Sequence, residues 1–131
     1  MVFSVPRSTV RFTIPDDWWQ FCDCARFHRK ADFYIYPPEL DLHTNVVAIE
    51  DVEPPQRDAG TELFKKHRLV PVLLGLQSQQ GVVPPVEVLV QGCGRYKYKV
   101  RNGFHRFYGS IALGFPRLPV TTKILIHCVK G

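Results

Sequence analysis

Positive side chains recur at every second position of residues 95–101, RYKYKVR, directly before Asn102-Gly103. In a strand, side chains alternate between two faces. One face would then carry the cations, which are Arg95, Lys97, Lys99 and Arg101. A row of cations can bind DNA phosphates without reading base sequence, and Arg117 and Lys123 could extend it. The alternative is an edge strand whose charges discourage pairing with other chains.

The Asn102-Gly103 pair is typical of a hairpin turn, but the residues after it predict a helix. Phe104, Phe107, Tyr108 and Ile111 are spaced i, i+3, i+4 and i+7, which places them on one helical face. Gly114 and Pro116 then suit a helix end. The sequence therefore predicts a strand, a tight turn at Gly103 and a helix.

The start of this helix is a candidate phosphate site. Helix starts carry unpaired backbone N–H groups and the positive end of the helix dipole. His105 and Arg106 add positive charge where the dipole disfavours it, and a bound phosphate would relieve that conflict. The alternative is that Arg106 pairs with Asp51 or Glu53.

Two further groups of residues could do chemistry. Glu50, Asp51 and Glu53 follow a predicted strand and could hold Mg²⁺ or act as a catalytic base beside bound phosphate. A solvated turn is the alternative. The segment Cys22-Asp-Cys24 with His28 could supply three zinc ligands, but its spacing matches no common zinc pattern. Buried thiols are the favoured interpretation, so no zinc site is expected from these residues.

Several secondary-structure elements must position these groups. Strands are expected at residues 8–14, 31–36, 45–52, 86–92, 96–101 and 120–129. Helices are expected at residues 61–69, with Asp58 or Thr61 as the cap, at 71–80, with Pro71 in the first turn, and at 104–113. At 131 residues the chain is expected to form a single α+β domain.

Composition favours an anionic partner. Seventeen Lys and Arg against 12 Asp and Glu give a net charge of +5. The basic character lies in residues 64–131, whose sole carboxylate side chain is Glu87. No apolar run is long enough to cross a bilayer, and the N-terminus does not resemble a signal peptide. We therefore expect a cytoplasmic protein with no membrane partner.

Residues 45–127 resemble the ParB/sulfiredoxin fold. The resemblance lies in VVAIEDVEPPQRD and in the later order of Pro-Pro, strand, turn, strand, Gly-x-His-Arg, helix and strand. It implies a mixed sheet with a few short helices, and nucleotide phosphates bound at the helix start. It also divides the domain into an unmatched N-terminal part, residues 1–44, and a ParB/sulfiredoxin-like part, residues 45–131.

The resemblance also implies roles for particular residues. Gly103 would allow close approach of phosphate, with Phe104 beside it; His105 and Arg106 would hold phosphate, and Arg57 would add a further contact. Phe104 stands where sulfiredoxins have their reducing cysteine, so sulfinic acid reduction is not expected. The expected function is ATP or CTP binding, with hydrolysis or phosphoryl transfer that could use Mg²⁺. A DNA-binding or nuclease module and a non-catalytic adaptor are the alternatives.

Overall fold

The computed structural model describes the backbone of residues 1–126 and the side chains of residues 1–122. The strands are β1 Val2–Ser4, β2 Arg11–Thr13, β3 Asn45–Ala48, β4 Val52–Glu53, β5 Val86–Val90, β6 Tyr98–Asn102 and β7 Arg117–Ile126. The α-helices are α1 Asp16–Phe21, α2 Lys66–Leu76 and α3 Phe104–Ala112. Short 3-10 helices occupy Cys24–Arg26, Pro38–His43 and Ile49–Asp51. This arrangement confirms the α+β class.

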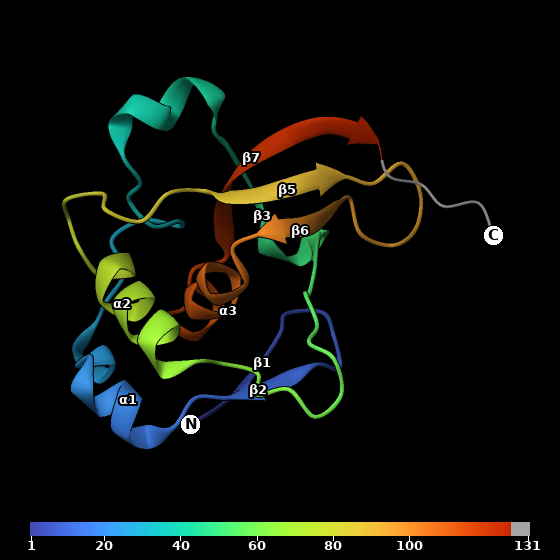
Figure 1. Ribbon diagram of the computed structural model, residues 1–131. Helices are drawn as coiled ribbons and strands as arrows, with labels where there is room; N and C mark the ends of the chain where they lie inside the picture. Colours follow the sequence, from blue (N-terminus) through green and yellow to red (C-terminus); the bar gives the residue numbers. More distant parts are fainter. Residues whose placement is uncertain (127–131) are drawn as a thin grey trace.

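Five strands form one mixed sheet in the order β3-β7-β5-β6-β4. Strand β5 runs antiparallel to β6 and parallel to β7, while the short β4 runs parallel to β6. Helices α2 and α3 lie together on one side of this sheet, and the separate pair β1–β2 lies farther out on that side (Figure 1). The strand, turn and helix expected around Gly103 are β6 and α3.

The segment predicted as one strand at residues 45–52 divides between the two edges of the sheet. Strand β3 pairs with β7, the 3-10 helix Ile49–Asp51 follows, and β4 then pairs with β6. Ile49 is buried and its N–H donates to the Pro116 carbonyl at 3.0 Å. This anchor turns the chain, so Glu53 reaches the strand that leads to Gly103.

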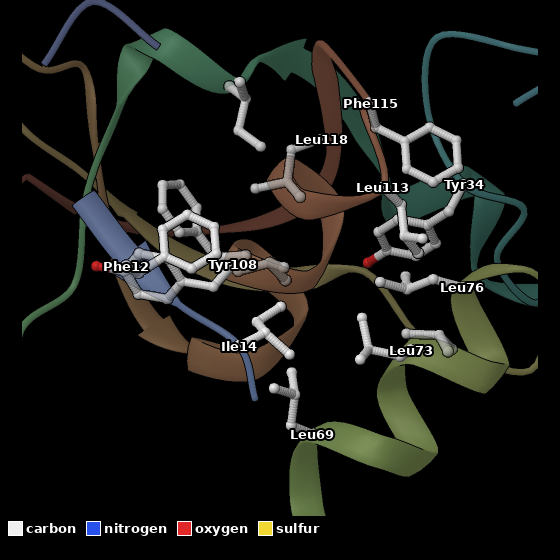
Figure 2. Close-up of a cluster of buried hydrophobic side chains, with 14 of the residues drawn as sticks. Phe12, Ile14, Tyr34, Leu69, Leu73, Leu76, Tyr108, Leu113, Phe115 and Leu118 are labelled. Carbon is white, nitrogen blue, oxygen red and sulfur yellow. The ribbon is translucent and has the colours of Figure 1, made fainter. Parts of the chain in front are cut away.

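The core forms where α2 and α3 pack against each other and against the sheet (Figure 2). Leu69, Leu73 and Leu76 are the buried face of α2. A Cβ at Gly109 of α3 would lie 3.0 Å from Leu76 Cδ1, so this glycine lets the two helices approach closely. Phe107 and Tyr108 are buried on the same helix. The other two residues of the predicted face, Phe104 and Ile111, are half-buried and pack against the core.

The N-terminal residues contribute to this same core. Phe12 of β2 is 3% exposed, and its ring lies 4.9 Å from Tyr108 and 5.9 Å from Phe64, centroid to centroid. Figure 2 shows Phe12 and Tyr108 side by side. Tyr34 is also buried, and its hydroxyl donates to the Pro84 carbonyl at 2.7 Å. Residues 1–44 therefore pack as part of the fold.

Two expected elements are corrected by the structure. Residues 31–36 form an irregular segment, because Tyr34 is held as a single buried anchor and pairs with no strand. The two helices expected at residues 61–69 and 71–80 are one helix, α2, with Pro71 inside it. Proline in a helix interior costs about 3 kcal/mol. Burial of the three leucines, at roughly 1.5–3 kcal/mol each, offsets that cost.

We predict that Phe12→Ala lowers the free energy of unfolding by about 3–5 kcal/mol, because it leaves a cavity among Tyr108, Phe64 and the surrounding core. Phe21→Ala is the matched control, since Phe21 is 71% exposed. The control should change stability by less than about 0.5 kcal/mol. Urea unfolding followed by circular dichroism measures both, and equal losses would show that the N-terminal pair of strands is not part of the core.

Candidate anion-binding site

A cavity of about 650 Å³ opens where α2 and α3 begin. It is lined from the loop after β4 by Pro55 and Arg57, from the start of α2 by Lys65, His67, Arg68 and Val72, from β6 and its turn by residues 100–103, and from the first turn of α3 by Phe104, His105 and Arg106. All five residues expected at a phosphate site, from Arg57 to Arg106, therefore line one space. Arg101 of the basic strand also reaches it.

The cavity is strongly basic. Arg and Lys contribute five of its lining residues, namely Arg57, Lys65, Arg68, Arg101 and Arg106, and His67 and His105 add two imidazoles. No Asp or Glu is among the lining residues. In a partly enclosed space these charges repel one another more strongly than they would in bulk water. A bound anion would replace that repulsion with attraction.

Both helices point their positive ends at this cavity. Neither α2 nor α3 has an acidic residue in its first turn, and neither N-terminus has a side-chain cap. The first N–H groups of a helix have no acceptor inside the helix, so the two starts present donors and positive dipole ends to the same space. This is the arrangement that favours anions at helix starts.

The turn before α3 requires glycine at position 103. Gly103 has φ of 129°, which side chains rarely adopt. A Cβ there would also lie 2.9 Å from Val86 Cγ1 and 3.2 Å from Arg106 Nε. The absent side chain therefore lets β6 turn directly into α3 over Val86, with the backbone open to the cavity.

Two of the arginines have partners inside the protein. Arg106 Nη1 donates to the Pro85 carbonyl at 2.6 Å and to the Pro84 carbonyl at 3.3 Å, so its guanidinium fastens the loop before β5. The alternative pairing with Asp51 or Glu53 is not found. Arg57 lies over the Phe104 ring at 3.8 Å, a cation–π contact that leaves its N–H groups available to a ligand.

His105 is buried and lies between the two helix starts. The Lys65 backbone N–H donates to His105 Nε2 at 3.3 Å. Burial, reinforced by the positive charges of Arg57, Arg68, His67 and Lys65, lowers the pKa of His105 to about 4. The imidazole is therefore neutral at physiological pH, and it does not supply the positive charge expected from the sequence.

The predicted catalytic carboxylates lie beside the basic strand and do not line the cavity. Asp51 Oδ2 is 3.7 Å from Lys97 Nζ, and the Asp51 carbonyl accepts the Lys97 N–H. Glu53 is opposite Lys99 in the pairing of β4 with β6, so their side chains share a face. Gly103 follows Lys99 by four positions, which is roughly 13 Å at about 3.3 Å per residue.

The outer end of the basic strand, at Arg95, contacts the N-terminal segment at Arg7. Glu50 Oε1 is 3.3 Å from Arg7 Nη1, and the Arg95 guanidinium donates to the Arg7 carbonyl. Lys97, Lys99 and Arg101 are exposed, as the alternation predicted. Arg101 lies on β6 beyond the point where the pairing with β4 ends. It is the cation of this strand that lines the cavity. Asp51 and Glu53 thus lie beside Lys97 and Lys99, whereas Glu50 pairs with Arg7.

The remaining candidates lie elsewhere. Cys22 and Cys24 are buried free thiols, and burial raises the pKa of both. Within residues 1–126 no group of three His, Cys, Asp or Glu residues could hold a metal ion. Arg117 donates to the Val46 carbonyl at 3.0 Å, and the side chain of Lys123 lies outside the described residues. None of the helices described is long and apolar enough to span a membrane.

The contribution of α2 to the cavity was not predicted from the sequence. Helix α2 begins at Lys66 and not at residue 61, because Phe64 is buried against Phe12, Phe104 and Tyr108 and its neighbour Lys65 is extended. The run Lys65-Lys66-His67-Arg68 therefore forms a helix start and not a helix interior. These four consecutive basic residues are the sequence signal that could have indicated a contribution to an anion-binding cavity.

No protein-family model and no curated protein matches the chain. Among solved structures, the C-terminally truncated chromosome-partitioning protein ParB from Caulobacter crescentus, complexed with CTP-γ-S, is 18% identical with a TM-score of 0.49 and 63% of this chain covered. The chain spans 44% of that ParB chain. Sulfiredoxin from Arabidopsis thaliana is 15% identical with a TM-score of 0.48, and covers 65% of this chain and 86% of its own. Both likenesses concern the fold alone.

We predict that Gly103→Ala destabilises the protein by more than about 2 kcal/mol, because strained backbone and overpacking each cost about 1–3 kcal/mol. Gly114→Ala is the matched control: Gly114 has φ of 89°, but a Cβ there would meet nothing within 4 Å. Urea unfolding should show the smaller loss for Gly114→Ala. Equal losses would mean that the Val86 contact does not constrain the turn.

We also predict that the pH dependence of stability contains a contribution from His105. Its pKa of about 4 in the folded state lies below the ordinary value of 6.5, so the unfolded chain binds the proton more readily. Stability from this residue is complete above pH 6.5 and is lost as the pH falls towards 4. As the pH falls over this range, the free energy of unfolding should therefore decrease more for the wild type than for His105→Gln. Parallel pH profiles for the two proteins would contradict a neutral, buried His105.

Proposed function

We propose that this protein binds the phosphate chain of a nucleoside triphosphate in the cavity between the starts of α2 and α3. The observation that carries the proposal is the meeting of five Arg and Lys side chains and two helix N-termini, with no carboxylate lining the space. A phosphate chain offers several negative charges and many acceptor oxygens. It can therefore engage side-chain cations and backbone N–H groups together.

The size of the cavity suits such a ligand. Small-molecule sites commonly measure about 300–1,000 Å³, and this cavity has about 650 Å³. Arg57, Lys65, Arg68 and Arg101 are exposed and can reach phosphate oxygens, whereas the Arg106 guanidinium is already bound to two carbonyls. In this proposal the first four residues hold phosphate and Arg106 maintains the shape of the turn. ATP and CTP are the nucleotides expected from the sequence resemblance.

We predict that Lys65→Ala and Arg68→Ala each weaken ATP or CTP binding by about tenfold or more, because each removes a charge-assisted hydrogen bond of about 1.5–3 kcal/mol. Lys66→Ala is the matched control, since Lys66 lies in the same first turn of α2 but not among the cavity residues. Isothermal titration calorimetry, with and without Mg²⁺, measures the three variants beside the wild type.

The control should lose less than about threefold in affinity, the size of a general change in charge near the surface. If Lys66→Ala is as damaging as the other two, the helix start attracts nucleotide only through its overall charge. A wild type that binds neither ATP nor CTP at low salt would refute the proposed function.

Hydrolysis or phosphoryl transfer by Glu50, Asp51 or Glu53 stays a prediction. The geometry favours binding over chemistry by these carboxylates, because Asp51 and Glu50 already face cations and none of the three lines the cavity. DNA binding by Lys97 and Lys99 also stays a prediction, and the neighbouring carboxylates reduce the charge available for it. A nucleotide turnover assay with divalent metals, applied to the wild type and to Glu53→Gln, separates an enzyme from a binding protein.

A further inference from the structure

We propose that His105 is a positioning residue: as a neutral acceptor it fastens the start of α2 to the start of α3, so that both face one ligand. This inference rests on the proposed function, because it concerns how the same site is assembled. It assigns to His105 a role different from direct contact with phosphate.

The geometry at His105 Nε2 carries the argument. This nitrogen accepts the Lys65 backbone N–H at 3.3 Å, and Lys65 is the N-cap residue of α2. A lysine side chain cannot accept a hydrogen bond, so it cannot cap its own helix. From α3, His105 therefore supplies an acceptor for the N-cap N–H at the start of α2. Because Nε2 accepts, the ring proton of the neutral form must sit on Nδ1.

The surroundings hold the ring in place and keep it neutral. His105 is 7% exposed. Its ring centroid lies 5.9 Å from that of Phe64 and 5.5 Å from that of Phe104. The charged and titratable groups that act on it are Arg57, Lys65, His67 and Arg68. A proton on Nε2 would give the ring a positive charge that these groups repel. It would also remove the acceptor for the Lys65 N–H.

The substitutions that test this role change charge and acceptor separately. His105→Gln retains an acceptor near the position of Nε2. His105→Leu removes the acceptor and keeps an apolar side chain. His105→Arg removes the acceptor but adds a permanent positive charge. If His105 held phosphate as a cation, the arginine variant would bind an anion as well as the wild type or better.

The probe is inorganic triphosphate, and binding is measured by calorimetry at pH 7. We expect the glutamine variant to bind within about threefold of the wild type, and the arginine and leucine variants to bind at least about tenfold more weakly. Binding by His105→Arg that equals or exceeds that of the wild type would overturn the inference. So would a glutamine variant as weak as the leucine variant. Urea unfolding of each variant shows whether the lost affinity exceeds what any unfolded fraction accounts for.

A second measurement does not depend on ligand binding. Imidazole ¹⁵N chemical shifts of the full chain should show His105 as the neutral Nδ1–H tautomer at pH 7, with Nε2 unprotonated, and still neutral near pH 5.5. An imidazolium signal at pH 6–7, or the opposite tautomer, would overturn the inference. If the wild type binds no triphosphate while these shifts are as expected, the proposed function fails and the link between the helices stands.

Discussion

Electrostatic repulsion around the cavity is the constraint that the rest of the structure must satisfy. Two helix starts and five Arg or Lys side chains meet there without a lining carboxylate. Acidic residues at these positions would stabilise both helices, by about 0.3–1 kcal/mol each. A sequence that departs from such a local preference is expected to do so at a functional site. The stability that is given up must come from packing elsewhere.

Aromatic packing provides that stability immediately behind the cavity. Phe64 contacts Phe12, Phe104 and Tyr108, which brings the residues before α2, the first turn of α3 and strand β2 together. The Tyr108 hydroxyl also donates to the Pro55 carbonyl at 2.6 Å and so holds the segment that carries Arg57. The N-terminal strands therefore support the cavity from behind, although none of residues 1–44 lines it.

The parts of the fold set by local pattern were predictable, and the parts set by distant contacts were not. The spacing of Phe104, Phe107, Tyr108 and Ile111 identified α3, and Gly103 identified its turn, because both signals lie within one short segment. The start of α2 was predicted wrongly, since Thr61 and Asp58 are good caps but burial of Phe64 decides where the helix begins. Tyr34 misled the strand prediction for a similar reason: its partner, the Pro84 carbonyl, is 50 residues away.

The division of charge follows from the path of one segment. Because Ile49 anchors a turn after β3, the carboxylates Asp51 and Glu53 run beside β6 and face Lys97 and Lys99. Strand β4 ends at Glu53, so the cations beyond it, beginning with Arg101, have no such neighbour in β4. The alternating charges that looked uniform in sequence therefore divide in two. One part is balanced across neighbouring strands, and the other is left unbalanced at the helix starts, where a phosphate chain can supply the missing negative charge.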